Sequence, residues 1–75
     1  MDRSGILVTG TTRVIFMIGT PVAQARSPFL FNRQFADIGE NRIMVPLDVS
    51  QAALPSFISM VRDAANCDGF VATLP

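Results

Sequence analysis

Several residue types that carry enzyme chemistry are missing from this 75-residue chain. It has no histidine, lysine, tyrosine or tryptophan, and its one cysteine is Cys67. Every basic side chain is an arginine, which stays protonated at any working pH and cannot act as a proton shuttle. One cysteine excludes an internal disulfide, and without histidine it cannot assemble a zinc site. We expect Cys67 to be a small buried apolar residue at a strand start, because no base is present to activate its thiol. The sequence therefore predicts neither a catalytic residue nor a metal site.

Charge is also sparse and balanced. Six arginines offset six acidic residues, and the acidic residues, which would have to supply any general base, form no recognisable pair. The charges are scattered singly, so nucleic acid is not an expected partner. No apolar run approaches the roughly 20 residues of a membrane span. Residues 1–12 lack the pattern of a signal peptide, so we expect no membrane contact and a cytoplasmic location.

The length allows at most one domain. A domain of this size buries only about 60% of its unfolded surface and is marginally stable alone. We therefore expect a fragment or an associating chain, with an oligomer or a further domain covering the open sheet edge. Residues 1–7 carry little pattern and are predicted to be a loose leader.

Three segments read as strands. Residues 13–18 form a continuous β-branched apolar run, which is typical of a parallel strand covered on both faces. Residues 42–49 form a second strand, which Pro46 assigns to a sheet edge because proline lacks a donor for the ladder. Residues 66–69 read as a turn that leads into a third strand over residues 70–74.

Two segments between these strands read as amphipathic helices. The first covers residues 28–38 and ends at Gly39, which can adopt the left-handed conformation of a helix terminus. Its apolar stripe, which we expect to lie on the sheet, is formed by Phe31, Phe35 and Ile38. The second helix covers residues 55–65, after a short capped turn that begins at Ser50. Its apolar side is formed by Leu54, Phe57, Ile58 and Val61.

The resulting β-α-β-α-β order predicts an α/β fold with a three-layer, mainly parallel open sheet and right-handed crossovers. Ligands of such sheets bind outside the carboxyl ends of the strands. Ser27 follows the first strand and Thr73 ends the third, so both should lie on that edge. If the third strand pairs beside the first, with the proline-bearing strand at the rim, the two hydroxyls face one crevice.

Both hydroxyl residues also have a purely structural interpretation. Ser27 precedes Pro28, and serine followed by proline is favoured at the cap and first position of a helix. The helix amides and Arg26 would favour a carboxylate or phosphate there. The local sequence alone favours the cap for Ser27 and a β-branched strand residue for Thr73. The glycines never approach G-x-G-x-x-G spacing, so no dinucleotide motif is visible.

Two separated stretches give the chain a family resemblance. Residues 19–28, GTPVAQARSP, and residues 69–75, GFVATLP, resemble the signature stretches of the substrate-binding domain of the shikimate dehydrogenase family. The first resembles G-x-P-x-x-x-S-x-S-P, with histidine and asparagine three and four places later. The second resembles N-V-T-x-P, followed shortly by lysine. The resemblance covers about residues 8–75, which we expect to be the first part of that domain.

The resemblance implies an NADPH-dependent oxidoreductase that reduces 3-dehydroshikimate to shikimate, or acts on a related acid with NAD. It implies that Ser27 and Thr73 hold the substrate carboxylate. It also implies that the catalytic lysine falls just beyond Pro75 and that a separate Rossmann domain binds NADP. Three positions depart from the motifs and make the pocket more apolar, namely Ala25 for serine, Phe31 for histidine and Val71 for asparagine.

A function from another class stays open at this point. The chain could be a non-catalytic module that binds a small carboxylic acid or another subunit, since it has no base and a high apolar content. The sequence thus leaves an oxidoreductase segment and an association module as alternatives.

Overall fold

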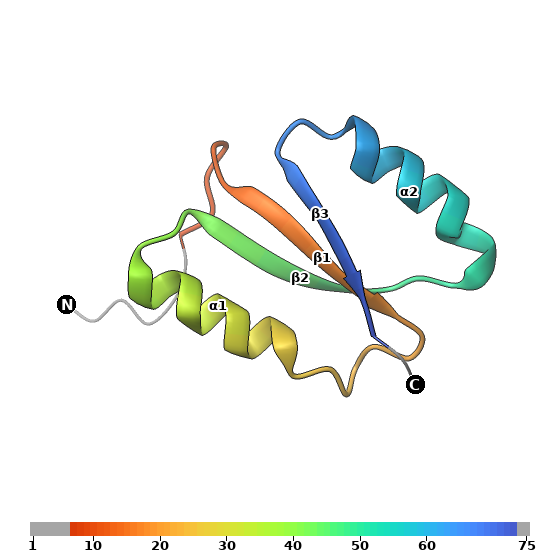
Figure 1. Ribbon diagram of the computed structural model, residues 1–75, viewed down its shortest axis with the longest axis horizontal. Helices are drawn as coiled ribbons and strands as arrows, with labels where there is room; N and C mark the ends of the chain where they lie inside the picture. The colour runs from red at the N-terminus through yellow and green to blue at the C-terminus, as the bar shows by residue number, and fades with distance from the viewer. Residues whose placement is uncertain (1–6, 74–75) are drawn as a thin grey trace.

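The computed structural model describes residues 7–73, along which strands and helices alternate (Figure 1). The elements in order are β1 Arg13–Gly19, α1 Ser27–Ile38, β2 Arg42–Asp48, a 3-10 turn η1 Gln51–Ala53, α2 Leu54–Asp63 and β3 Cys67–Ala72. The predicted β-α-β-α-β order is confirmed. The predicted leader, apart from Leu7, and the predicted strand end at Leu74 lie outside the described residues.

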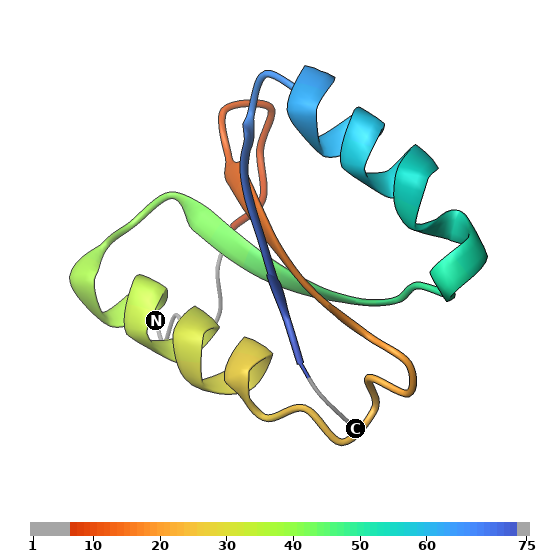
Figure 2. The same cartoon turned by 45° about the vertical axis from the view of Figure 1, so that its right-hand side comes forward.

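The three strands form one parallel sheet in the order β2-β1-β3. The strand that carries Pro46 lies at the rim, as the sequence predicts. The third strand lies beside the first, which is the condition that the sequence analysis set for a shared crevice. Because the two crossovers run in opposite directions along the sheet, right-handed connections place α1 and α2 on opposite faces. Figures 1 and 2 show this arrangement, with the sheet as the middle of three layers.

The face under α2 is held by aromatic packing. Phe57 is 7% exposed, and its ring meets Phe16 of β1 and Phe70 of β3 edge to face, at centroid distances of 5.6 and 5.2 Å. Such edge-to-face pairs contribute about 0.5–1.5 kcal/mol each beyond the burial of apolar area. Phe57 therefore attaches α2 to two strands at once.

Helix α1 is attached to the sheet by a polar contact, and here one expectation was wrong. The predicted stripe of Phe31 and Ile38 does not lie on the sheet, since these side chains are 47% and 60% exposed. The helix instead turns Asn32 toward β2, where its amide bonds both backbone groups of Met44. Phe35 of the same stripe is half-buried. The polar contact rotates Phe31 and Ile38 to the flank of the helix.

A hydrogen-bonded network closes the amino ends of the strands. Thr12 is 2% exposed; its hydroxyl donates to Asn41 Oδ1 at 2.8 Å, and its carbonyl accepts from Asn66 Nδ2 at 2.9 Å. Arg13 and Arg42 are opposite each other in the ladder, and like charges so placed repel. Asp68 lies between them and pairs with both, at 2.6 and 3.0 Å.

The start of β3 corrects a second expectation. Residues 66–69 were predicted to be a turn, but β3 begins at Cys67. Cys67 pairs with Val14 and Gly69 with Ile15, so Asp68 is an extra residue of a bulge, and Gly69 adopts a φ of 137° that favours glycine. The bulge aims the Asp68 carboxylate at the two arginines. Cys67 is half-buried at the strand start.

Helix termini agree with the sequence at some positions only. Gly39 has the predicted left-handed conformation, with φ 75°. Ser50 accepts a hydrogen bond from the Ala53 amide and caps η1, as expected. Neither helix of the described part of the chain is long and apolar enough to cross a membrane.

Candidate functional site

The carboxyl ends of the strands are joined by backbone hydrogen bonds at the end of β1. The Thr73 amide donates to the Ile18 carbonyl at 2.8 Å, and the Val49 amide donates to the Gly19 carbonyl at 3.0 Å. The segments that leave β2 and β3 are thereby both fixed against β1. We call this edge of the sheet the carboxyl edge.

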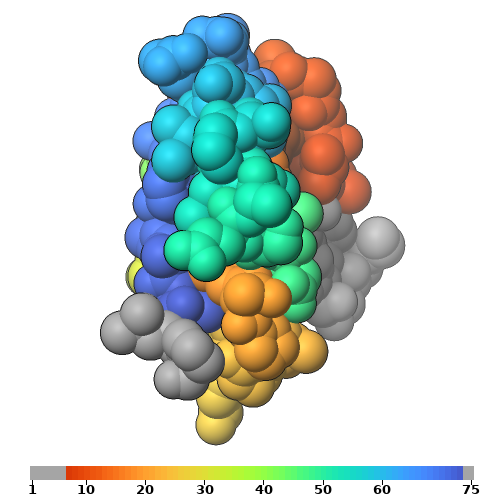
Figure 3. Space-filling model, turned by 90° about the vertical axis from the view of Figure 1, so that its right-hand side faces the viewer, coloured from red at the N-terminus to blue at the C-terminus, as the bar shows by residue number. Residues whose placement is uncertain are grey.

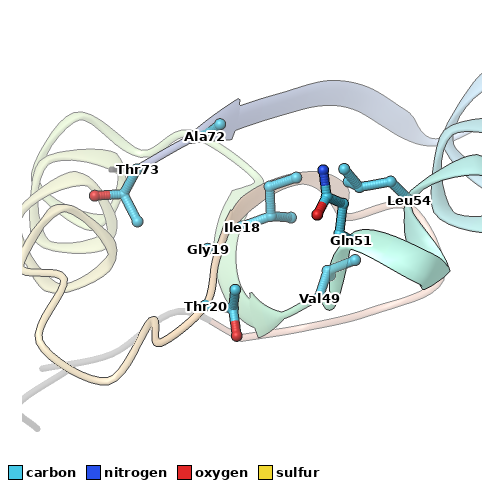
Figure 4. Close-up of a pocket in the computed structure, with 8 residues that line it drawn as sticks. All are labelled: Ile18, Gly19, Thr20, Val49, Gln51, Leu54, Ala72 and Thr73. Carbon is cyan, nitrogen blue, oxygen red and sulfur yellow. The ribbon is translucent and has the colours of Figure 1, made fainter. Parts of the chain in front are cut away.

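Gly19 allows an unusually close approach at this edge. A Cβ atom built on Gly19 would lie 2.5 Å from the γ-methyl carbon of Thr73 and 3.4 Å from the Pro21 carbonyl oxygen. The methyl group therefore occupies the space that a side chain at position 19 would need. In Figure 4 the Thr73 hydroxyl points away from the apolar side chains of the pocket described below. Contact with Gly19 thus fixes which way the hydroxyl points.

The connection from β1 to α1 is a folded loop. It contains a cis peptide bond between Thr20 and Pro21. The Gln24 side chain donates to the Pro21 carbonyl at 3.1 Å, and the Ala25 amide donates to the Val22 carbonyl at 3.0 Å. These bonds hold the loop that carries the chain to the start of α1.

The structure corrects the predicted role of Ser27 as a helix cap. Ser27 is the first residue of α1, and the N-cap is Arg26, whose own backbone is helical, with φ −100° and ψ −16° and no side-chain cap. A capping side chain needs an extended backbone, which the loop does not supply here. Pro28 is buried while Ser27 is only half-buried. The Ser27 hydroxyl is thus free of a capping role.

A pocket of about 470 Å³ opens at the carboxyl edge on the side of α2. We call it the edge pocket; its lining residues are Ile18, Gly19, Thr20, Val49, Gln51, Leu54, Ala72 and Thr73. They come from the ends of β1 and β3, from the segment that follows β2 and from the start of α2 (Figure 4). Figure 3 shows the start of α2 meeting the β1–α1 connection on this side of the molecule. The walls are mainly apolar.

The structure places the two predicted site residues differently. Thr73 lines the edge pocket, whereas Ser27 is not among its lining residues and lies beyond the loop, at the start of α1. Sequence reasoning missed the polar side chains of Thr20 and Gln51, which line the pocket. The rule that ligands bind at carboxyl ends of strands would have found Gln51, which follows β2 closely.

The three positions that depart from the family motifs lie in the β1–α1 loop, in α1 and in β3. Ala25 is half-buried in the loop before α1. The ring of Phe31 packs edge to face on Phe35, with centroids 6.2 Å apart. Val71 pairs with Met17 in the sheet and is 42% exposed. Each replaces a polar side chain of the motif with an apolar one.

The ionisable groups described between residues 7 and 73 form no reaction centre at the pocket. Asp68 lies at the opposite end of the strands, where its hydrogen bond from Arg13 lowers the pKa of the carboxyl below the ordinary 3.8. Partial burial opposes this shift, and the charges of Arg13 and Arg42 add to it. Within the same residues, no group of three histidine, cysteine or acidic side chains could hold a metal ion.

Fold and site together define a parallel α/β segment with a pocket at its carboxyl edge, the edge at which open sheets of this kind usually bind ligands. Residues 17–75 match the family model described as the shikimate dehydrogenase substrate binding domain. The chain therefore belongs to the shikimate dehydrogenase family.

Individual relatives agree with this assignment. The chain is 37% identical over 68 residues to the NADP⁺ shikimate dehydrogenase of Rubrobacter xylanophilus, covering 91% of this chain and 24% of that protein. It is also 37% identical over 65 residues to the Methanocaldococcus jannaschii enzyme, covering 87% and 22%. A crystal structure of a shikimate dehydrogenase in complex with NADP⁺ superposes with a TM-score of 0.88 at 34% identity, covering 99% of this chain and 25% of that one. The chain spans about a quarter of the length of these relatives.

Proposed function

We propose that this chain is the substrate-binding segment of a shikimate dehydrogenase-like oxidoreductase, and that its carboxyl edge holds the carboxylate of shikimate or a related acid. One observation carries the proposal. The amide of Thr73 bonds to Ile18 and its methyl group rests on Gly19, so the end of β3 lies directly against the end of β1. The two stretches that resemble family motifs therefore meet at one place, although they are about 50 residues apart in the chain.

The hydroxyls of Ser27 and Thr73 would donate hydrogen bonds to the carboxylate oxygens. A hydroxyl donates without changing its own protonation, so the grip does not depend on the titration of either side chain. The first amides of α1 have no intrahelical partner and carry a partial positive charge, which favours an anion. Arg26, exposed at the start of the helix, adds a permanent charge close by.

The alanine at position 25 supports an altered substrate preference. The family motif has serine there, so this chain has one hydroxyl fewer for the carboxylate. A hydrogen bond to a charged group is worth about 1.5–3 kcal/mol, or tenfold or more in binding. We therefore expect weaker binding of shikimate itself, and a Ala25→Ser variant to bind it more tightly.

The cofactor of the enzyme is proposed to be NADP, or NAD, bound by a domain that is not among these residues. The described residues do not fit a dinucleotide. The connection between β1 and α1 carries Gly19 alone and is occupied by the loop of residues 20–26, where a dinucleotide fold has a glycine-rich turn. The part played by this segment is to bind and orient the acid.

The test is a titration of the isotope-labelled chain with shikimate, followed by NMR at every backbone amide. We expect the largest shifts near Ser27 and Thr73. Ser27→Ala and Thr73→Val should each weaken binding about tenfold or more, and Thr73→Val keeps the methyl group that rests on Gly19. Ser59→Ala, on the exposed side of α2, is the matched control and should bind as the unmodified chain does. Saturating shikimate without shifts at these two positions would refute the proposal.

A second candidate, an association module, is favoured by the exposed apolar surface. Among residues 7–73 the buried apolar side chains are Met17, Ile18, Met44, Phe57 and Pro28, whereas ten large ones are exposed, including Phe29 at 67%. Apolar surface of this extent is commonly an interface. Sedimentation velocity from micromolar to millimolar chain would distinguish the two candidates. A mass that rises with concentration, without shikimate-induced shifts, supports the association module.

A further inference from the structure

One side chain holds the middle of α1 against the sheet. Asn32 Nδ2 donates to the Met44 carbonyl at 2.8 Å, and Asn32 Oδ1 accepts from the Met44 amide at 2.7 Å. Both bonds are partly buried, and Met44 itself is 2% exposed. A two-bond contact of this kind fixes the distance and the rotation of the helix together.

The contact also occupies backbone groups that a sheet edge leaves unpaired. β2 lies at the rim, and in a parallel strand alternate residues direct their amide and carbonyl to the same side. Met44 and Pro46 thus share the outer side; Asn32 satisfies the first, and the second has no amide hydrogen to offer. The free backbone groups at the edge of β2 therefore determine where α1 is bonded, and apolar packing does not.

Ser27 depends on this contact for its place. It precedes Asn32 by five residues, about 7.5 Å of helix rise, and its own side chain makes no cap. The apolar residues Phe29, Leu30 and Phe31, which lie between them, are exposed and cannot hold the helix start on the sheet. Pro28 is the buried residue of α1, so its packing and the Asn32 contact together hold the first turns of the helix.

We propose that Asn32 is the positioning residue of the site. Its two bonds to Met44 set the height and rotation of α1, and thereby hold Ser27 at the carboxyl edge for the substrate carboxylate. The inference deepens the proposed function and rests on it. It assigns to Asn32 a role in affinity that acts through the position of Ser27, since both polar atoms of the Asn32 side chain are already bonded to Met44.

The test compares Asn32→Ala with Asn66→Ala. Asn66 also donates to a backbone carbonyl, that of Thr12 at 2.9 Å, but at the opposite end of the strands. The two variants therefore distinguish a loss of affinity caused by the position of Ser27 from one caused by lower stability of the fold. Amide spectra without ligand come first, and we expect Asn32→Ala alone to move the Ser27 and Met44 signals. We then expect shikimate to bind Asn32→Ala about tenfold more weakly than Asn66→Ala, the loss expected when one hydrogen bond to a charged group fails.

Asn32→Asp keeps the size of the side chain and the oxygen that accepts from Met44, and serves if Asn32→Ala does not fold. Its signal shifts and its affinity should lie between those of the unmodified chain and Asn32→Ala. Equal affinities of the two alanine variants, or unmoved Ser27 signals in both Asn32 variants, would overturn the inference while the proposed function stands. Absence of shikimate binding by the unmodified chain would overturn the proposed function, and the inference with it.

Discussion

Replacing Gly19 with alanine tests the packing that brings the two motif stretches together. The backbone of Gly19 is not in the left-handed region, since among the glycines of residues 7–73 only Gly39 and Gly69 have positive φ. Alanine can therefore adopt the same backbone, and only the clash of its Cβ with the Thr73 methyl carbon at 2.5 Å opposes it. Since Thr73 is β-branched and stiff at χ1, its methyl group cannot easily give way. Overpacking of this kind costs about 1–3 kcal/mol.

The direction of the change in stability shows whether the added Cβ clashes. At a position without a clash, glycine to alanine stabilises by about 0.4–1 kcal/mol, because the unfolded chain loses freedom. Gly10→Ala is the matched control, since nothing lies within 4 Å of a Cβ at Gly10. We expect Gly19→Ala to lower Tm, by about 4–8 °C for each kcal/mol in a domain of this size, and Gly10→Ala to leave it unchanged or raise it.

A double-mutant cycle identifies the clashing atom. Thr73→Ser removes the methyl group and keeps the hydroxyl, so the Gly19→Ala, Thr73→Ser double variant should recover most of the lost stability. The measurement is thermal and urea unfolding followed by circular dichroism. A Gly19→Ala variant as stable as the Gly10→Ala control, or a double variant without recovery, would refute the reasoning.

Two further predictions concern charge and core. Because the hydrogen bond from Arg13 lowers the pKa of Asp68 below 3.8, the folded state binds that proton less tightly than the unfolded state. This stabilisation is complete at a pH above the ordinary pKa of aspartate, and it is lost as the pH falls through the pKa of Asp68 in the folded state. Asp68→Asn should flatten acid unfolding curves, whereas Asp63→Asn, at an exposed position, should not; identical curves would contradict the assignment. In denaturant unfolding, Phe57→Ala should lower the free energy of unfolding by about 3–5 kcal/mol and largely unfold the chain. Ile58 is 45% exposed, so Ile58→Ala should cost far less. Similar losses in the two variants would contradict the packing described for Phe57.

The order of elements was predictable because each strand and helix carries its own pattern. The β-branched run of β1 and the single proline of β2 assign the centre and the rim of the sheet without knowledge of the rest of the fold. Gly39 ends α1 for a reason local to its backbone, which reaches φ 75°. Features of this kind depend on a few neighbouring residues, so the sequence alone is enough to predict them.

The rotation of α1 was not predictable from periodicity. The helical stripe of Phe31, Phe35 and Ile38 looked like the buried face, but the sheet edge bonds Asn32 and leaves two of the three side chains exposed. A polar contact with the backbone of another strand leaves no periodic signal. Ser27 failed as a cap for a related reason, since the conformation at Arg26 is set by the loop.

At the site itself, the sequence placed Thr73 at the carboxyl edge but missed Gln51 and Thr20. These residues have no motif of their own and become neighbours only when the strands align. That Thr73 lines the pocket while Ser27 lies across the loop likewise follows only from the three-dimensional structure.

The central claim is that the carboxyl edge recognises a carboxylate. The most direct measurement compares the dissociation constants of shikimate and of its methyl ester for the same labelled chain, from shifts near Ser27 and Thr73. The ester keeps the ring and its hydroxyls but has no negative charge, so the account predicts binding about tenfold or more weaker. Equal dissociation constants would contradict the claim, since the edge would then recognise the ring and not the acid.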